Sequence, residues 1–166
     1  MVFVNLYNDM KKIKTNAARL LDQAKINYEL LTYEVDEEDL SAVHLAETSG
    51  QSVERIFKTL VLEGNKISPI VCVITGDKEL DLKIVAKVSG NKKVDLIPMK
   101  SLLSLTGYIR GACSPIGMKK LYPTYIHETC LNFDTIFVSA GQRGVQIEIN
   151  PLDLVKVVKA EVCLLF

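Results

Sequence analysis

The sequence lacks an excess of charge of either sign. Among its 166 residues, lysine and arginine contribute 20 side chains and aspartate and glutamate also contribute 20, so the formal net charge is zero. Modules that bind nucleic acid over a broad surface usually carry a marked positive excess, so the composition excludes that class. Any nucleic-acid contact must use a local patch, and Lys92, Lys93, Lys119 and Lys120 are the best candidates.

The sequence also lacks long apolar runs. Its apolar stretches, such as residues 70–74, are far shorter than the roughly 20 residues that span a bilayer. The opening residues 1–14 do not read as a secretory signal, because their apolar part precedes the lysines and no apolar region follows. We therefore expect a protein with no membrane contact, located in the cytoplasm.

Potential metal ligands are few. None of the four cysteines forms a C-x-x-C pair, and only His44 and His127 offer imidazole ligands, which argues against a zinc site. Cys72 and Cys163 lie in apolar runs and are predicted to be buried free thiols, as is typical of a reducing compartment. Cys113 is a candidate nucleophile, but nothing in the sequence places either histidine beside it. No metal and no cofactor are predicted.

The remaining composition is that of an ordinary globular protein. Apolar residues make up 48% of the chain, and there are only 9 glycines and 5 prolines. That apolar fraction, with balanced charge, excludes disorder as the main state. No internal repeat or linker is present, so we expect a single domain over residues 1–166.

Helices and strands are predicted to alternate irregularly. We expect helices over residues 15–25, 42–48, 82–88 and 100–105, with a last helix starting at Asn150–Pro151. Strands are expected over residues 28–35, 57–62, 68–75, 93–97, 124–126, 135–139 and 145–149. The region 106–123 is read as strand pieces joined by loops. Without a regular βαβ order, the pattern favours a mixed sheet with helices packed on it.

Lys58 is the first unusual residue. It shares one face of a predicted strand with Leu60 and Leu62, and both faces of that strand are largely apolar. One interpretation is a strand-end lysine whose stem carries the ammonium out to water. The other is a lysine at the mouth of a cleft that binds an anionic group such as a phosphate. The sequence leaves both open.

Two glycine-rich segments, 106–117 and 139–144, are the other candidates. Both could be ordinary turns. Alternatively, their free N–H groups could hold a carbonyl or phosphate oxygen, with Arg143 as a further donor. Neither segment matches a dinucleotide-binding or P-loop pattern.

Three motifs carry a resemblance to a known family. They are FKTL at 57–60, TGY-x-x-G-x-x-SP-x-G at 106–117 and SAG-x-RG at 139–144, in that order. Over residues 15–158 the sequence resembles the YbaK/EbsC trans-editing factors and the editing domain of bacterial prolyl-tRNA synthetases. The resemblance implies an α/β (α+β) fold, with a strongly curved mixed sheet that approaches a barrel and has flanking helices.

The resemblance also implies an activity. These factors deacylate mischarged tRNA, typically Cys-tRNA(Pro), and the thiol of the substrate is proposed to attack its own ester. A protein nucleophile is then unnecessary. The implied partners are the 3′ acceptor end of aminoacyl-tRNA and, as a candidate, prolyl-tRNA synthetase. The alternatives are deacylation of Ala-tRNA(Pro), or a non-catalytic module that binds an acceptor end or a synthetase. Monomer and homodimer both stay open.

The same resemblance assigns residues. The catalytic set is Lys58, which would grip the 3′-terminal adenosine phosphate region, with Gly111 and Ala112 of the glycine loop. The substrate-binding set is Tyr33, Thr59, Ser114, Pro115, Ser139, Gly141, Arg143 and Gly144.

Three features depart from the family pattern. The family usually has a second glycine where this chain has Ala112, and the added methyl could crowd the terminal adenosine. Some relatives have an acidic residue where this chain has Gln146, which we therefore assign no catalytic role. The last six residues, EVCLLF, are unusually apolar and are expected to pack on the body or against a second subunit.

Overall fold

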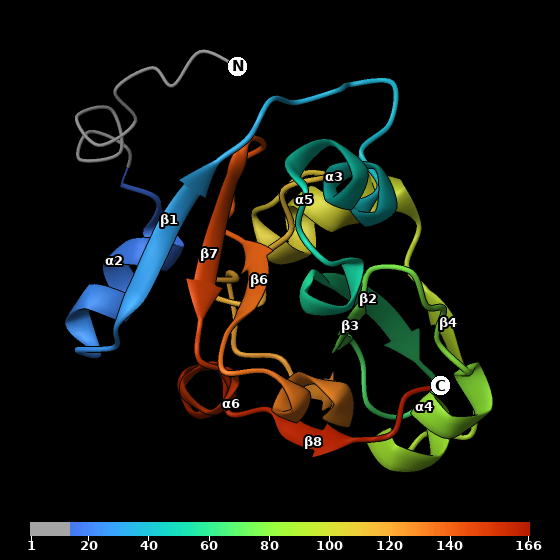
Figure 1. The fold of residues 1–166 in the computed structure, drawn as a ribbon. Helices are drawn as coiled ribbons and strands as arrows, with labels where there is room; N and C mark the ends of the chain where they lie inside the picture. Colours follow the sequence, from blue (N-terminus) through green and yellow to red (C-terminus); the bar gives the residue numbers. More distant parts are fainter. Residues whose placement is uncertain (1–13) are drawn as a thin grey trace.

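The computed structural model describes residues 14–166, and the expectation about a secretory signal concerns residues that lie almost wholly outside this range. Two sheets face each other across the molecule (Figure 1). The smaller sheet has the order β1 (Tyr28–Thr32), β7 (Val145–Ile149), β6 (Ile136–Ser139). The larger has the order β4 (Val94–Leu96), β2 (Phe57–Gly64), β3 (Ile70–Thr75), β5 (Thr124–His127), β8 (Glu161–Cys163).

Strand directions make the larger sheet mixed. β2 runs antiparallel to both β3 and β4, whereas β5 lies parallel to β3 and to β8. The smaller sheet is antiparallel throughout. A single parallel bridge between Ile56 and Phe137 joins the two sheets. The mixed α/β class is confirmed, and the curved surface stays open between the sheets instead of closing into a barrel.

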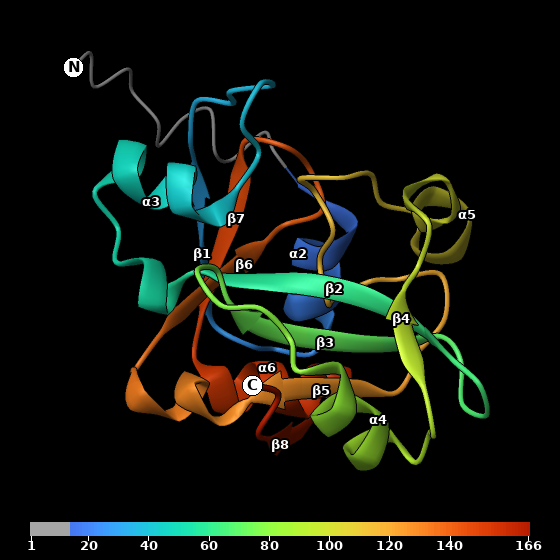
Figure 2. The same cartoon turned by 90° about the vertical axis from the view of Figure 1, so that its right-hand side faces the viewer.

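The helices cover the outer surfaces of the sheets (Figure 2). They are α2 (Asn16–Gln23), α3 (Ala42–Ser49), α4 (Leu82–Ser89), α5 (Leu102–Thr106) and α6 (Pro151–Val158), with short 3₁₀ turns η1 (Val53–Arg55), η2 (Met99–Ser101) and η3 (Glu128–Asn132). The caps follow the sequence signals. Thr15, Asp81 and Asn150 accept hydrogen bonds from the first turns of α2, α4 and α6. Gly50 and Gly90 end α3 and α4 in the left-handed conformation.

β3 is buried on both of its faces and divides the interior. Val71 and Val73 belong to a core shared with α2, α6 and the smaller sheet. Ile70, Cys72 and Ile74 belong to a second core beneath α4. The near-continuous apolar sequence of β3 reflects this double burial.

Two predictions for the loops and the C-terminal segment need correction. No strand occurs within residues 107–123, because local bonds such as Ala112 N–H to Ile109 O satisfy that backbone and Gly107, Gly111 and Gly117 adopt positive φ. The EVCLLF segment instead contains a strand, β8, that the sequence analysis missed. It packs on the body, with Leu165 wholly buried, whereas the Cys163 thiol is only partly buried.

Within residues 14–166, every helix is too short or too polar to cross a bilayer.

Candidate functional site

A cavity of about 480 Å³ lies where the two sheets, the loop before α3 and the segment after β4 meet. Strand residues form one wall of this cavity and loop residues form the other. Its lining includes Tyr33, Glu38, Asp39, Leu40, Ser41, Phe57, Lys58, Thr59, Leu96, Met99, Leu102, Arg110, Gly111, Cys113, Phe137, Ser139 and Gln146. The cavity therefore brings together five of the predicted site residues, namely Tyr33, Lys58, Thr59, Gly111 and Ser139.

Lys58 lies on β2 and lines the cavity. Its side chain is partly buried, and the ammonium donates to Gly76 O at 3.2 Å. Burial lowers the pKa of Lys58 from its usual value, and the nearby carboxylates of Glu79 and Asp77 oppose that shift. Of the two interpretations left open by the sequence, the structure favours a lysine at a cleft.

The open edge of β2 forms another part of the strand wall. β4 pairs with β2 only at residues 62–64, and the last bond between them runs from Ile97 N–H to Val61 O at 3.1 Å. On the opposite edge, Ile56 O accepts from Gly76 N–H. Main-chain groups alternate between edges in an antiparallel strand, so the N–H and C=O of Thr59 point to the open edge.

The Thr59 hydroxyl is also available. Its Oγ1 is buried and has no hydrogen-bond partner among the described residues. A buried hydroxyl without a partner costs about 1–3 kcal/mol, so its placement in a cavity wall is consistent with a ligand contact.

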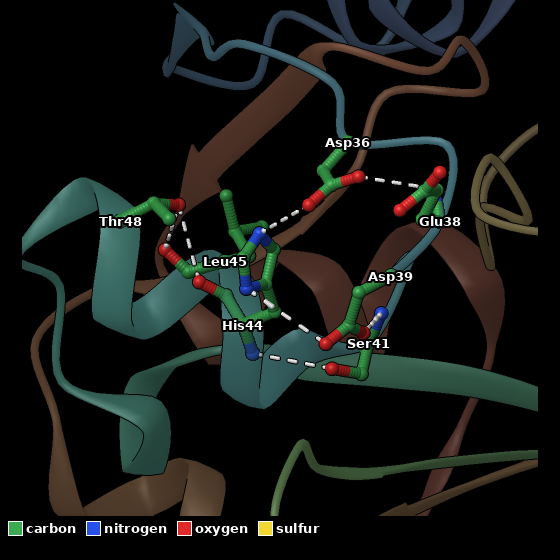
Figure 3. A network of polar contacts seen from close by, with 7 residues as sticks. All are labelled: Asp36, Glu38, Asp39, Ser41, His44, Leu45 and Thr48. Carbon is green, nitrogen blue, oxygen red and sulfur yellow. Dashed lines mark hydrogen bonds and ion pairs between the residues drawn. The ribbon is translucent and has the colours of Figure 1, made fainter.

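A polar network holds the loop wall (Figure 3). His44 on α3 contacts Asp36 at 3.1 Å through Nε2 and Asp39 at 3.8 Å through Nδ1. Ser41 Oγ caps α3 by accepting from His44 N–H, and Ser41 N–H donates to Asp39. Residues 36–39 are all exposed, yet these contacts hold the loop that they form against α3. The capping Ser41 followed by His44 was the available signal that this loop is fixed to α3.

The glycine loop contributes unequally to the cavity. Gly111 lines it with φ +81°, and a Cβ there would lie 3.2 Å from the Leu40 side chain. Ala112 is only 2% exposed and does not line the cavity. Ser114 and Pro115 are also buried away from it, and Ser114 Oγ accepts from Ile116 N–H at 3.2 Å.

The SAG-x-RG turn mostly supports the cavity from behind. Ser139 lines it, whereas Gly141, Arg143 and Gly144 lie outside the lining. Gly141 has φ +94°, and a Cβ there would lie 2.6 Å from the Tyr108 ring.

The other two residues of the turn hold cavity residues in place. Gly144 O accepts from Tyr33 N–H at 2.9 Å, which holds Tyr33 in the wall. Arg143 Nε donates to Arg110 O at 2.9 Å, which fixes the turn that precedes Gly111.

Gln146 was not assigned a role from the sequence, yet it lines the cavity and is only 3% exposed. Its Oε1 accepts from Gln51 Nε2 at 3.0 Å, and Gln51 Oε1 is buried without a partner among the described residues. The two side chains come from positions 95 residues apart, so no local sequence signal could have paired them.

In the described part of the chain, no cysteine or serine side chain that lines the cavity is hydrogen-bonded to a histidine ring. Cys113 lines the cavity, but burial raises the pKa of its thiol to about 12, so the thiol is neutral near pH 7. His44 is held by Asp36 and Asp39 outside this lining. His127 stacks on Phe166, with ring centroids 3.8 Å apart. Residues 14–166 also contain no cluster of three or more His, Cys, Asp or Glu side chains suited to a metal ion.

Comparison with known proteins identifies the family. Residues 36–157 match the model of the aminoacyl-tRNA editing domain. An Enterococcus faecalis relative, EbsC, is 54% identical over 138 residues, 83% of this chain and 84% of its own. That relative's name assigns it as a Cys-tRNA(Pro)/Cys-tRNA(Cys) deacylase. A Bacillus subtilis protein of unassigned function, YwhH, is 33% identical over 109 residues, 66% of this chain and 69% of its own.

Solved structures agree on the fold. One described as a trans-editing enzyme for prolyl-tRNA synthetase superposes with a TM-score of 0.76 at 22% identity, over 92% of this chain and 98% of its own. Another, of a protein of unassigned function, superposes with a TM-score of 0.80 at 22% identity, over 89% of this chain and 96% of its own. The resemblance found in the motifs is thus confirmed, and the chain belongs to the family of aminoacyl-tRNA editing domains, within the YbaK/EbsC group.

Proposed function

We propose that this protein hydrolyses the ester of mischarged Cys-tRNA(Pro), releasing cysteine from the tRNA. The observation that carries this proposal is a cavity that contains Lys58 and the unpartnered Thr59 hydroxyl but, within residues 14–166, no serine or cysteine bonded to a histidine ring. The name of the 54% identical relative supports the choice of substrate. Such a cavity suits a substrate that supplies its own nucleophile.

The proposed reaction has two steps. The cysteine thiolate of the substrate attacks the ester carbonyl, a C–S bond forms, and the C–O bond to the terminal ribose breaks. The ribose oxygen leaves with a proton, and water then hydrolyses the cyclic thioester to free cysteine. The protein contributes positioning and stabilisation of the oxyanion that develops on the carbonyl.

Named residues take up these tasks. Lys58 binds the phosphate region of the 3′-terminal nucleotide, because its ammonium is held in the cavity wall. The Thr59 hydroxyl, the main-chain N–H of Thr59 and the loop at Gly111 face the cavity as donors for the carbonyl oxygen. Tyr33 and Ser139 flank the aminoacyl group.

Selectivity follows partly from this chemistry. Alanine and proline carry no thiol, so their esters lack the internal nucleophile even when they enter the cavity. Correctly charged Pro-tRNA(Pro) is therefore spared without a pocket that excludes proline by size.

A panel of charged tRNAs tests the proposal. Cys-tRNA(Pro), Ser-tRNA(Pro) and Ala-tRNA(Pro) are incubated with the protein, and the remaining ester is measured over time. We expect Cys-tRNA(Pro) to be cleaved at least about 100-fold faster than Ser-tRNA(Pro), which replaces the thiol with a poorer nucleophile.

Each other outcome has a defined meaning. Equal cleavage of Ala-tRNA(Pro) would show that no substrate thiol is needed and would overturn the mechanism. Binding without cleavage of any ester would overturn the assignment as an enzyme and favour a tRNA-binding module.

Prolyl-tRNA synthetase is the proposed partner, and the cytoplasm is the proposed compartment. A protein that holds only the 3′ end has few contacts with which to identify the tRNA, so a bound synthetase would supply that selection. Addition of the synthetase is expected to raise kcat/KM for Cys-tRNA(Pro) over Cys-tRNA(Cys). An unchanged ratio would remove the synthetase from the proposal.

A further inference from the structure

The zero net charge of the chain conceals two oppositely charged segments that both border the cavity. Residues 34–54 contain no lysine or arginine but seven acidic residues: Glu34, Asp36, Glu37, Glu38, Asp39, Glu47 and Glu54. Residues 92–120 contain only one acidic residue, Asp95, but six basic residues: Lys92, Lys93, Lys100, Arg110, Lys119 and Lys120. Both segments contribute residues to the cavity lining.

The acidic side is a fixed structure. Asp36, Glu37, Glu38 and Asp39, here called the acidic rim, are all exposed, and Glu38 and Asp39 line the cavity. Figure 3 shows how His44 and Ser41 hold this loop against α3. The rim therefore keeps a concentration of negative charge at one side of the cavity mouth.

The basic side lies around α5. Lys119 Nζ donates to Ser104 O at 3.2 Å, which places Lys119 and its neighbour Lys120 beside this helix. Lys100 lies in η2, directly before α5, and all three lysines are exposed. We call Lys100, Lys119 and Lys120 the basic rim. In Figure 2, α5 and β4 lie at the opposite end of β2 from α3.

Exposed apolar side chains accompany the basic rim. Leu96 is 55% exposed, Met99 59% and Leu103 54%, and Leu96 and Met99 also line the cavity. The acidic rim has no comparable set. Proteins that bind single-stranded nucleic acid combine basic residues for the phosphates with flat side chains for the bases, and here exposed aliphatic side chains beside the lysines offer the apolar contact.

We propose that the single-stranded 3′ end of the tRNA reaches the cavity across the basic rim. The bases rest on Leu96, Met99 and Leu103, and the phosphates lie near the lysines. The acidic rim repels phosphates and so sets the direction from which the strand enters. This inference rests on the proposed function and names the surface by which its substrate is bound.

A pair of charge reversals tests the path. Lys100→Glu with Lys120→Glu reverses the basic rim while leaving the cavity lining intact. The matched control is Lys83→Glu with Lys156→Glu, two exposed lysines on α4 and α6 that give the same change in net charge. Three measurements are made: binding of an uncharged RNA oligonucleotide ending in CCA, cleavage of Cys-tRNA(Pro), and cleavage of the cysteinyl ester of adenosine.

The expected result distinguishes binding of the RNA strand from cleavage of the ester. Reversal of the basic rim weakens RNA binding and lowers kcat/KM on Cys-tRNA(Pro) by about tenfold or more. It also makes the salt dependence shallower by about 1.4 in log–log slope, because two phosphate contacts on a single strand contribute roughly 0.7 each. Cleavage of cysteinyl-adenosine, which has no phosphate, stays unchanged, and the control pair changes each quantity less than twofold.

A charge reversal on the acidic rim is expected to have the opposite effect on RNA binding. Glu37→Lys on the acidic rim is expected to tighten RNA binding severalfold without changing cleavage of cysteinyl-adenosine. Equal losses from the rim and control pairs would show that only net charge matters, and unchanged RNA binding in the rim pair would refute the path. Either outcome would refute only the path of the strand, and the proposed function would still be supported if the wild-type protein cleaves cysteinyl-adenosine. If wild type cleaves neither ester, the proposed function fails while the binding arm still tests the path.

Discussion

The two walls of the cavity are built by different means. The strand wall, with Lys58, Thr59 and Gln146, consists of residues held in β-ladders, and Gln146 also pairs with Leu31 of the distant strand β1. The loop wall, with residues 36–41 and the Gly111 turn, is held by side-chain contacts from His44 and Arg143. The loop wall therefore depends on a few side-chain contacts, whereas main-chain hydrogen bonds hold the strand wall.

This difference assigns separate tasks to the walls. Groups that act on the ester need an unchanging geometry, which a ladder provides. The loop wall carries the acidic rim and the left-handed Gly111, so it sets the shape and the charge of that side of the cavity.

Lys58→Ala on the strand wall is expected to lower kcat/KM for Cys-tRNA(Pro) by about 100-fold, as when an enzyme loses one charged donor. Lys66→Ala, an exposed lysine at the tip of the same hairpin, is the control and should have little effect. Because burial lowers the pKa of Lys58, wild-type activity should also decline with rising pH before a free lysine titrates near 10.4. Full activity in Lys58→Ala would remove this residue from the mechanism.

Gly111→Ala tests the loop wall. The left-handed backbone costs an alanine about 1 kcal/mol, and the new Cβ would also press on Leu40 at 3.2 Å. Gly50→Ala is matched to it, because Gly50 has φ +74° and open space around it. Both variants should show similarly lowered unfolding free energies in urea, but only Gly111→Ala should lose activity, by roughly tenfold. Equal activity in the two variants would show that the loop wall does not shape the cavity.

Thr59→Val and Thr75→Val form a second matched pair. Each removes a buried hydroxyl that has no partner in the described chain, and only Thr59 lines the cavity. Both variants should raise the free energy of unfolding by about 1 kcal/mol. Thr59→Val alone should lower kcat by up to about tenfold, the value of one hydrogen bond in the transition state. If Thr59→Val keeps wild-type kcat, its hydroxyl does not contact the substrate.

Cys113→Ala should have the smallest effect, less than about twofold in kcat/KM. A thiol whose pKa is raised to about 12 supplies almost no thiolate at pH 7. Steady-state rates and thermal unfolding are measured together to separate a packing defect from a chemical one. Abolished activity in a folded variant would make Cys113 the nucleophile and would overturn cleavage by the substrate thiol.

Local patterns predicted the elements well. Caps at Thr15 and Asp81 and terminating glycines at Gly50 and Gly90 marked helix ends, because these signals act within one turn. The strands expected at 57–62 and 68–75 are present as β2 and β3, which pair antiparallel. The missed strand β8 depends on pairing with β5, more than 30 residues earlier, and three residues are too few to show a period.

The candidate site was predicted by motif order more than by chemistry. Lys58, Gly111 and Ser139 do meet at one cavity. Ala112, Ser114 and Gly141 lie behind it, because a motif records residues that shape a loop as well as those that face a ligand. The pairing of Gln51 with Gln146 was not predicted, since a contact between two amides 95 residues apart leaves no spacing in the sequence.

Because β4 is short, the edge of β2 beside Thr59 stays unpaired. The strand ends at Leu96, Ile97 makes the last bond to β2, and Pro98 then directs the chain into η2. In the same register, the next residue to pair would be Met99, opposite Thr59. An insertion or a replacement of Pro98 that let β4 continue would seal the free edge with the protein's own backbone. The activity would then fall because β4 had gained residues and covered the edge of β2, while the rest of the fold stayed intact. At Pro98, an increase in regular structure is thus expected to lower the activity.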